Sequence, residues 1–403
     1  MDRRSFLLGT ATLASQLLAG CGSQDAASLL RVQLLKGSIP SNLVKKFSNE
    51  LGVQVKFAPV EQLQDLFTQL ESWSKQPTGN ADDKSWLDYF GEWLPFPFNK
   101  SKQAPLSELV TLGDYWLALA IEQNLIQPLD ETKLEQWKYL PSHWQKLVRR
   151  NSLGQLELKG KGKVWAAPYR WGHTVIAYNR NKFKPSEQTQ IDWRDLWEEK
   201  ALRGRISLLN HPREVIGLTL KKLKHSYNTL DLDTVPQLKN DLRALHQRVK
   251  LYSSDTYLQP LILGDTWLAV GWSTDVLPVM QRYKQIAAVI PKSGTALWAD
   301  LWVRPVTWKR PEVNDSSTSK DEQSLGEKWI DFCWKQENAQ KISLLTEAIS
   351  PISEQLKLAD IPERLRSVLW PKPQSFEGSE FLLPLPKKTM QQYQSLWQIL
   401  GNS

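Results

Sequence analysis

Cysteine is nearly absent from this 403-residue chain, which contains only Cys21 and Cys333. So few cysteines exclude a disulfide framework and a cysteine-based metal site. Cys333 lies in the apolar run Trp-Ile-Asp-Phe-Cys-Trp over residues 329–334, where a free cysteine is expected to act as a small buried hydrophobic side chain. Stability must therefore come from a packed core.

A strong excess of one charge and the common catalytic motifs are missing as well. Lys and Arg number 51 against 43 Asp and Glu, and no basic stripe stands out, so nucleic acid is not an expected partner. The chain has no Gly-x-Ser-x-Gly, no His-Glu-x-x-His and no phosphate loop, which argues against an enzyme. His211 has no second histidine at metal-ligand spacing, so neither a metal nor a cofactor is expected.

The N-terminus carries an export pattern. An uncharged, mostly apolar stretch over residues 6–19 follows Arg3-Arg4 and is too short to span a bilayer, so residues 1–20 are predicted to be a removable signal peptide. Leu-Ala-Gly-Cys at residues 18–21 resembles a bacterial lipobox, and Arg-Arg-Ser-Phe-Leu at residues 3–7 resembles a twin-arginine signal. We expect a lipid on Cys21 to hold the exported protein at a membrane face. The alternative is an ordinary signal peptide that happens to end in cysteine.

The chain is too long for one compact core, and its length is typical of two lobes. Its first part alternates strands and helices, predicted over 29–35, 41–51, 53–57 and 61–73, which indicates an α/β domain with a parallel sheet. Residues 75–105 are rich in Gly, Pro, Asn and Lys but contain many aromatics, which predicts an inserted flap. Helices are predicted further on over 114–124, 212–225, 235–250, 325–346 and 390–400, and strands over 173–179, 205–209, 266–272, 286–290 and 300–306.

Four stretches carry a family resemblance. Residues 168–179, Pro-Tyr-Arg-Trp-Gly-His-Thr-Val-Ile-Ala-Tyr-Asn, resemble a segment of the spermidine/putrescine-binding family of periplasmic solute receptors. Asn-His-Pro-Arg-Glu-Val at 210–215, the stretch 264–275 ending in Gly-Trp-Ser-Thr-Asp, and 290–300 ending in Trp-Ala-Asp resemble later segments of that family in the same order.

The resemblance implies a two-lobed, type II-like periplasmic-binding-protein fold of the α/β class, with the ligand in a cleft between the lobes. We expect lobe 1 to comprise 29–172 plus 300–350, and lobe 2 to comprise 173–299 plus 351–403. Crossings between the lobes are expected near 171–175, Asp300 and Ser350. The protein would then be a monomeric receptor that delivers its solute to ABC permease subunits.

The resemblance also implies binding residues. Tyr115 matches an aromatic contact, Glu214 and Asp300 match acids that pair with ammonium groups, and Trp272 and Trp298 match stacking tryptophans. A polyamine needs carboxylates at its charged ends and aromatic faces along its chain, to which Asp275 and Trp171 are further candidates. Each residue also has a structural explanation. Glu214 would cap a helix in any case, Trp171 and Trp272 fit a core, and Arg170 is expected to pair with an acid on the surface.

Some positions depart from the family. His211 stands where the family has an acid, no aromatic lies near Gly37 and Pro40, and Ser350 lies near the family's late tyrosine. We therefore expect a short diamine to be held better than a long polyamine, and we expect protonation of His211 to weaken cation binding as the pH falls through the imidazole range. Alternatives are a receptor for a different solute, an exported glycan-processing enzyme that uses Glu214 and Asp300, and an assembly partner with an empty cleft.

Overall fold

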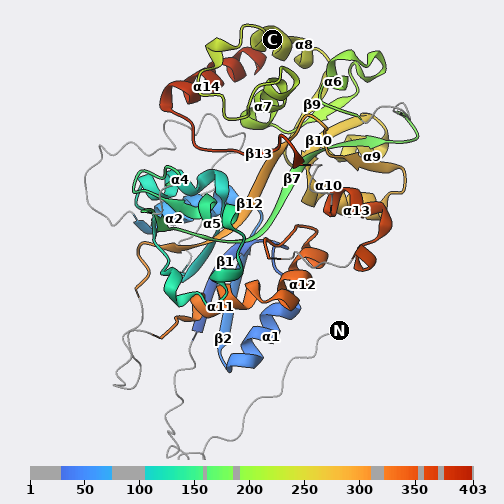
Figure 1. Ribbon diagram of the computed structural model, residues 1–403. Helices are drawn as coiled ribbons and strands as arrows, with labels where there is room; N and C mark the ends of the chain where they lie inside the picture. The colour runs from blue at the N-terminus through green and yellow to red at the C-terminus, as the bar shows by residue number, and fades with distance from the viewer. Residues whose placement is uncertain are drawn as a thin grey trace, which may run out of the picture.

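The computed structural model describes residues 29–74, 105–157, 161–184, 191–309, 322–352, 358–370 and 376–401. The predicted signal peptide, Cys21 and all but the last residue of the predicted insertion at 75–105 lie outside these residues. The described chain forms two lobes, one above the other in Figure 1, and the long strands β7 (Ala167–Asn179) and β12 (Ala296–Pro305) run from one to the other. None of the described helices is long and apolar enough to cross a membrane.

Lobe 1, the lower one in Figure 1, is built on three parallel strands: β1 (Leu29–Leu35), β2 (Gln54–Val60) and β3 (Leu109–Gly113). Its helices are α1 (Ser41–Leu51), α2 (Leu63–Ser74), α4 (Asp114–Glu122), α5 (Ser142–Val148), α11 (Leu325–Trp334) and α12 (Gln336–Thr346). Short strands β4 (Ile126–Gln127), β5 (Arg149–Arg150) and β6 (Lys163–Val164) complete it.

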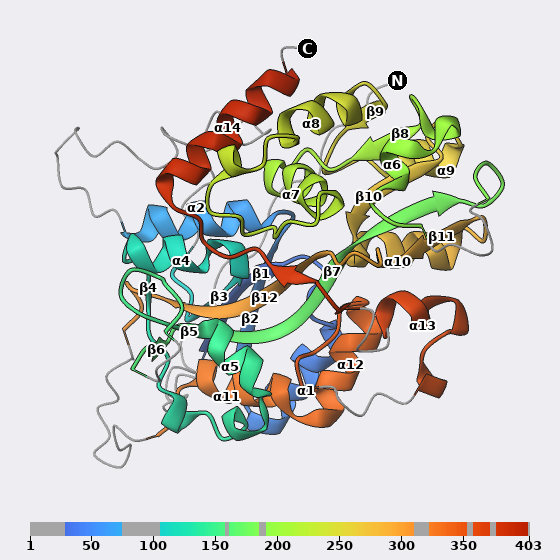
Figure 2. The same cartoon turned by 45° about the horizontal axis from the view of Figure 1, so that its top comes forward.

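The first two elements are the ones that the sequence predicts, with the same bounds. Strand 29–35 is confirmed because its apolar run is buried between neighbouring strands. Helix 41–51 is confirmed too: Pro40 precedes it, and Gly52 ends it in the left-handed conformation at φ 64°. Figures 1 and 2 show α1 and α11 on one side of these strands and α2 and α4 on the other.

The two long strands join the lobes into one sheet with the order β2-β1-β3-β12-β7-β10-β8-β9. The first half of β7 pairs with β12, which itself pairs with β3 of lobe 1. The second half of β7 pairs instead with β10 (Leu268–Trp272) and β11 (Ile286–Val289) of lobe 2. The junction between the lobes therefore lies within two strands rather than in a loop.

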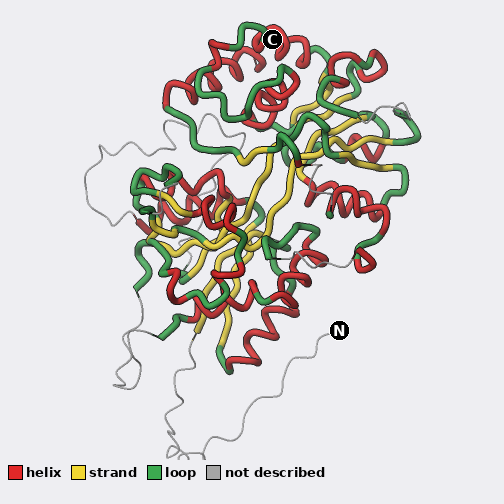
Figure 3. Tube along the Cα trace, viewed as in Figure 1, coloured by secondary structure: helices red, strands yellow, loops and turns green. Residues whose placement is uncertain are grey.

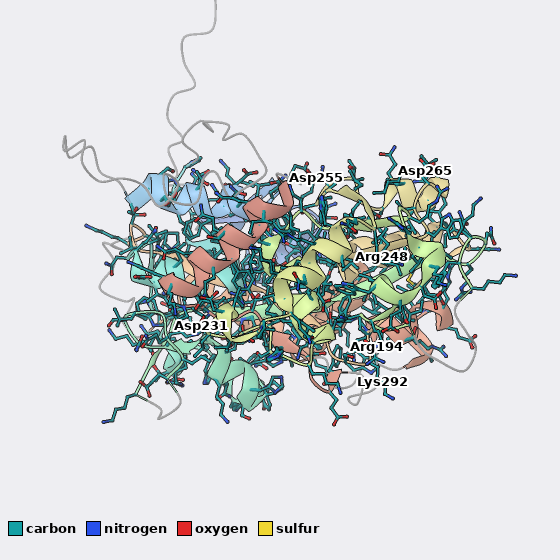
Figure 4. The ribbon with its side chains drawn as sticks, turned by 90° about the horizontal axis from the view of Figure 1, so that it is seen from above. Arg194, Asp231, Arg248, Asp255, Asp265 and Lys292 are labelled. Carbon is teal, nitrogen blue, oxygen red and sulfur yellow. The ribbon has the colours of Figure 1, made fainter. Side chains whose placement is uncertain are left out.

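Lobe 2 adds strands β8 (Ile206–Leu208) and β9 (Val249–Tyr252), both parallel to their neighbours, and β13 (Glu380–Phe381), which pairs with the start of β12. Its helices are α6 (Asp195–Glu198), α7 (Pro212–Lys222), α8 (Leu238–His246), α9 (Gln259–Leu263), α10 (Ser273–Arg282), α13 (Glu363–Leu369) and α14 (Lys387–Gly401). Figure 3 shows strands running through the middle of both lobes with helices around them. Figure 4 shows the molecule from above, where lobe 2 carries both acidic and basic side chains, among them Arg194, Asp231, Arg248 and Asp255.

A third contact between distant segments lies next to the long strands. The backbone N–H of Trp171 donates to the carbonyl of Ile349, and the N–H of Ile349 donates to the carbonyl of Trp171, both at 2.8 Å. Residue 349 follows α12 of lobe 1, whereas α13 packs on α10 in the core of lobe 2. The chain thus passes from one lobe to the other a third time between these helices.

Each lobe has its own core. Tryptophans contribute heavily to that of lobe 1, where Trp302 stacks on Tyr169 with ring centroids 4.2 Å apart and Cys333 is buried, as predicted. The strand predicted over 173–179 begins earlier, at Ala167, and two predicted helices are also wrong in extent. The helix predicted over 325–346 is interrupted at Lys335, whose ψ of 130° is extended. The helix predicted over 235–250 ends at His246, and its last residues enter β9.

Candidate functional site

One face of the joined strands collects most of the predicted residues. Side chains alternate along a strand, so Arg170, Gly172 and Thr174 share one face of β7. The register places Asp300 opposite Arg170 and Trp298 opposite Gly172. Asp300 and Trp298 therefore lie on this same face, which we call the site face.

The absence of a side chain at Gly172 makes this arrangement possible. A Cβ added there would lie 2.3 Å from Cζ2 of Trp298 and 2.5 Å from Oγ of Ser273, the first residue of α10. The indole of Trp298 thus packs directly over the backbone of β7, next to the start of a helix in lobe 2. The buried Nε1 of Trp298 has no hydrogen-bond partner among the described residues.

Glu214 is a buried acid on this face that forms no ion pair with a described residue. It lies in the first turn of α7, which begins at Pro212, and is 3% exposed. Both of its carboxylate oxygens accept from the Thr174 hydroxyl at 3.0 Å, and Oε1 also accepts from Nε1 of Trp272 at 3.2 Å. All these donors are neutral. Burial raises the pKa of the Glu214 carboxyl to about 7, against the lowering effect of these hydrogen bonds and of the Arg213 charge.

Asp300 differs from Glu214 because it already forms an ion pair with a cation of the protein, Arg170. Nε of Arg170 lies 2.7 Å from Oδ2 of Asp300, and the two side chains are 6% and 2% exposed. The prediction that Arg170 pairs with an acid on the surface is therefore wrong in its location, because strand register buries the pair. Burial alone would lower the pKa of the Arg170 guanidinium. The negative charge of the Asp300 carboxylate acts in the opposite direction, and the pKa stays above its ordinary value. The guanidinium also lies 6.0 Å from the Trp298 ring.

Asp275 lies in the first turn of α10 and accepts a hydrogen bond from the Tyr257 hydroxyl at 2.9 Å. The same hydroxyl accepts from the backbone N–H of Trp272 at 3.2 Å. Burial raises the pKa of Asp275, and the charge of Arg170 acts to lower it. Asp275 thus lies within the influence of the Arg170 charge. Through the Tyr257 hydroxyl it also helps to hold Trp272, whose indole N–H donates to Glu214.

Tyr115 and His211 meet from opposite lobes. Tyr115 is on α4 of lobe 1, and its ring centroid lies 6.0 Å from that of His211, which precedes α7 in lobe 2. The Arg213 guanidinium lies 5.9 Å from the same tyrosine ring and donates to the carbonyls of Leu383 and Tyr227 and to Oδ1 of Asn228. Burial, and then the charge of Arg213, lowers the pKa of His211 to about 4. The expected titration of His211 in the imidazole range is therefore wrong.

Trp171 is not on the site face. It alternates with Arg170 and Gly172, and its ring packs instead against Trp144 of α5 at 5.6 Å and Phe376 at 5.2 Å. His173 shares this opposite face and also contacts Phe376. These residues pack the junction, so Trp171 lies apart from Glu214 and Trp298.

Sequence analysis missed several contacts of the site. Thr174 and Ser273 lie inside the recognised stretches, and strand alternation from Gly172 would have pointed to Thr174. Tyr257 and Asp114 lie outside these stretches and carried no local signal. Asp114 accepts the backbone N–H of Ala299 at 2.8 Å, and burial raises its pKa to about 7.

Two cavities lie elsewhere in the described chain. One of about 300 Å³ lies between α5 and the β13 region, and one of about 200 Å³ lies between α1 and α11. Neither cavity is lined by a residue predicted for the site. No group of three or more described His, Cys, Asp or Glu side chains is placed to hold a metal ion.

Comparison with known proteins gives a consistent picture. Residues 99–364, more than half of the chain, match the family described as bacterial extracellular solute-binding protein. The spermidine/putrescine-binding periplasmic protein of Escherichia coli is 25% identical over 275 residues, which cover 68% of this chain and 67% of that protein. A putrescine-binding periplasmic protein of the same organism is 28% identical over 219 residues, covering 51% and 57% of the two chains.

Solved structures agree in fold. A spermidine/putrescine ABC transporter substrate-binding protein from Streptococcus pneumoniae superposes with a TM-score of 0.71 at 18% identity, covering 93% of this chain and 99% of that one. A lipoprotein of Treponema pallidum superposes with a TM-score of 0.63 at 17% identity and the same coverage. These similarities confirm the predicted α/β fold with two lobes.

Proposed function

Because the chain belongs to the family of bacterial extracellular solute-binding proteins, we propose that it is the receptor of an ABC importer and captures a small organic cation of the polyamine type. Members of this family are solute-binding proteins, so the chain is a receptor that works outside the cytoplasm and not an enzyme. The rival function as a glycan-processing enzyme is therefore set aside.

The observation that carries the choice of ligand is the state of Glu214. Its carboxylate is buried, accepts only from neutral donors and forms no ion pair with a described residue. A buried carboxylate is stabilised most by a cation that comes within hydrogen-bond distance. The indole of Trp272 lies next to it, and in this proposal its ring contributes an aromatic contact to the same cation. These features support an ammonium group at Glu214.

Two further observations support a solute at this place. The buried Nδ1 of His211 has no hydrogen-bond partner among the described residues, although buried polar atoms almost always have one. Relatives with 25% and 28% identity are named for spermidine and putrescine. Since His211 offers no fixed negative charge, the proposed ligand is a short amine such as putrescine in preference to spermidine.

The remaining parts of the proposal concern the whole receptor. Lobe 1 would comprise 29–172 plus 300–350 and lobe 2 would comprise 173–299 plus 351–403, with the solute held between Tyr115, Trp272, Asp275, Trp298 and the acids of the site face. A lipid on Cys21 would anchor the receptor at the membrane, where it would deliver solute to permease subunits.

Calorimetric titration of the purified protein tests the ligand. Putrescine should bind more tightly than spermidine, and succinate, a dianion of similar length, should not bind. Glu214→Gln should weaken putrescine binding at least about 30-fold, because the ammonium would lose its buried charged partner. The matched control is Glu363→Gln, which removes an exposed glutamate from the first turn of α13. Equal affinities in wild type and Glu214→Gln, or binding of succinate alone, would contradict the proposal.

A further inference from the structure

Arg170 has the surroundings that a bound ammonium would need. Its guanidinium forms a buried ion pair with Asp300 and lies 6.0 Å from the ring of Trp298. A carboxylate, an aromatic face and exclusion from water are the features with which proteins hold an organic cation. Strand register produces them here, because Arg170 and Asp300 are direct partners across β7 and β12.

We propose that Arg170 is a built-in cation that takes the place of one ligand ammonium at Asp300, so that the receptor selects solutes that present a single ammonium, at Glu214. This inference rests on the proposed function, since it presumes that the site face binds an organic cation.

The charges around the site support a single ammonium. The acids predicted for the site are Glu214, Asp275 and Asp300, and the arginines whose charges act on them are Arg170 and Arg213. Three acids against two arginines leave one negative charge. Arg213 gives its hydrogen bonds to two carbonyls and an asparagine and forms no ion pair with a described acid.

The other titratable groups nearby do not change this balance. Asp114 and Arg150 are buried, and each carries a charge that acts favourably on the other. His173 and His211 are kept neutral because burial lowers their pKa values to about 3 and about 4. A ligand with one positive charge therefore neutralises the site. A second ammonium would be desolvated while Asp300 is already paired with Arg170, which is unfavourable.

Ligand choice in wild type and Arg170→Gln tests the inference. We would titrate both proteins at pH 8 with butylamine, putrescine and spermidine, which share a four-carbon amine and differ in the number of ammonium groups. Wild type should bind butylamine at least as tightly as putrescine, and spermidine least tightly. Arg170→Gln frees Asp300 and should shift the preference toward putrescine over butylamine by at least about tenfold. Arg194→Gln, which removes an exposed arginine beside α6, should leave the preference unchanged.

A second variant keeps the test decisive if the single variant fails to fold. Arg170→Gln combined with Asp300→Asn removes both charges of the buried pair, and it should show the wild-type preference for butylamine. A wild type that binds putrescine tenfold or more tightly than butylamine would overturn the inference, as would a double variant that prefers putrescine. If the amines bind through Glu214 but Arg170→Gln leaves their order unchanged, only the role of Arg170 is refuted. If no amine binds the wild type, the proposed function itself fails.

Discussion

Replacing Glu214 with glutamine should make the ligand-free protein more stable relative to wild type as the pH rises, although the variant loses its cation anchor. Burial raises the pKa of this carboxyl from 4.5 to about 7 in the folded state. Between these values the unfolded chain releases the proton while the folded protein keeps it. The sign follows directly: with a folded pKa above the unfolded one, wild type loses stability as the pH rises through this window.

The magnitude comes from the size of the shift. One pKa unit corresponds to about 1.4 kcal/mol, so a shift from 4.5 to about 7 makes the ionised Glu214 cost about 3 kcal/mol above pH 7. Between pH 5 and pH 8 the expected change is about 2–3 kcal/mol. Glutamine does not ionise, so the variant lacks this term. Its amide adds an effect of its own near Trp272 and Thr174, but that effect does not depend on pH.

Denaturant unfolding of both proteins without ligand at pH 5, 6.5 and 8 measures this term. The free energy of unfolding of Glu214→Gln minus that of wild type should grow by about 2–3 kcal/mol from the lowest to the highest pH. The control Glu363→Gln removes an exposed carboxyl, and its difference from wild type should stay nearly constant. A constant difference for Glu214→Gln as well would refute the argument that burial leaves this carboxylate without sufficient compensation.

Three further predictions address binding, packing and anchoring. Putrescine affinity should fall up to about tenfold per pH unit below pH 7, because protonation of Glu214 removes the ammonium partner; calorimetry should show a flat profile for Glu214→Gln. Gly172→Ala should lower the melting temperature and weaken amine binding, since its Cβ would lie 2.3 Å from Trp298 and overpacking costs about 1–3 kcal/mol; unchanged thermal melts would contradict the packing over β7. Cys21→Ser should release the protein from membranes, and a variant that stays in the membrane pellet with unchanged mass would disprove the lipid anchor.

Local sequence patterns were sufficient for the elements at the start of lobe 1. The run at 29–35 and the Pro40 and Gly52 signals around helix 41–51 act within a few residues, so no distant contact is needed to predict them. The break at Lys335 has no such signal, because neither proline nor glycine marks it. Residues 249 and 250 are predicted as the end of a helix, but pairing with β8 makes 249–252 a strand. In that case a tertiary contact outweighs local preference.

In the site, too, local sequence predicts which residues take part, whereas contacts between distant segments decide how they pair. The recognised stretches contain Glu214, Trp272, Trp298 and Asp300, which the structure gathers around the site face. The pairing of Asp300 with Arg170 depends on the register between segments 130 residues apart, which neither segment encodes alone. Strand alternation also separates Trp171 from this group, although it directly follows Arg170 in sequence.

The cost of burying Glu214 and the affinity for a cation have one physical origin. In the free receptor at pH 8 the carboxylate is ionised with only neutral donors around it, which costs about 3 kcal/mol. A bound ammonium supplies the missing charge. The thermal stabilisation given by putrescine at a fixed concentration should therefore be larger at pH 8 than at pH 6, where a proton already occupies Glu214. Equal stabilisation at both values would mean that the ammonium binds somewhere other than this carboxylate.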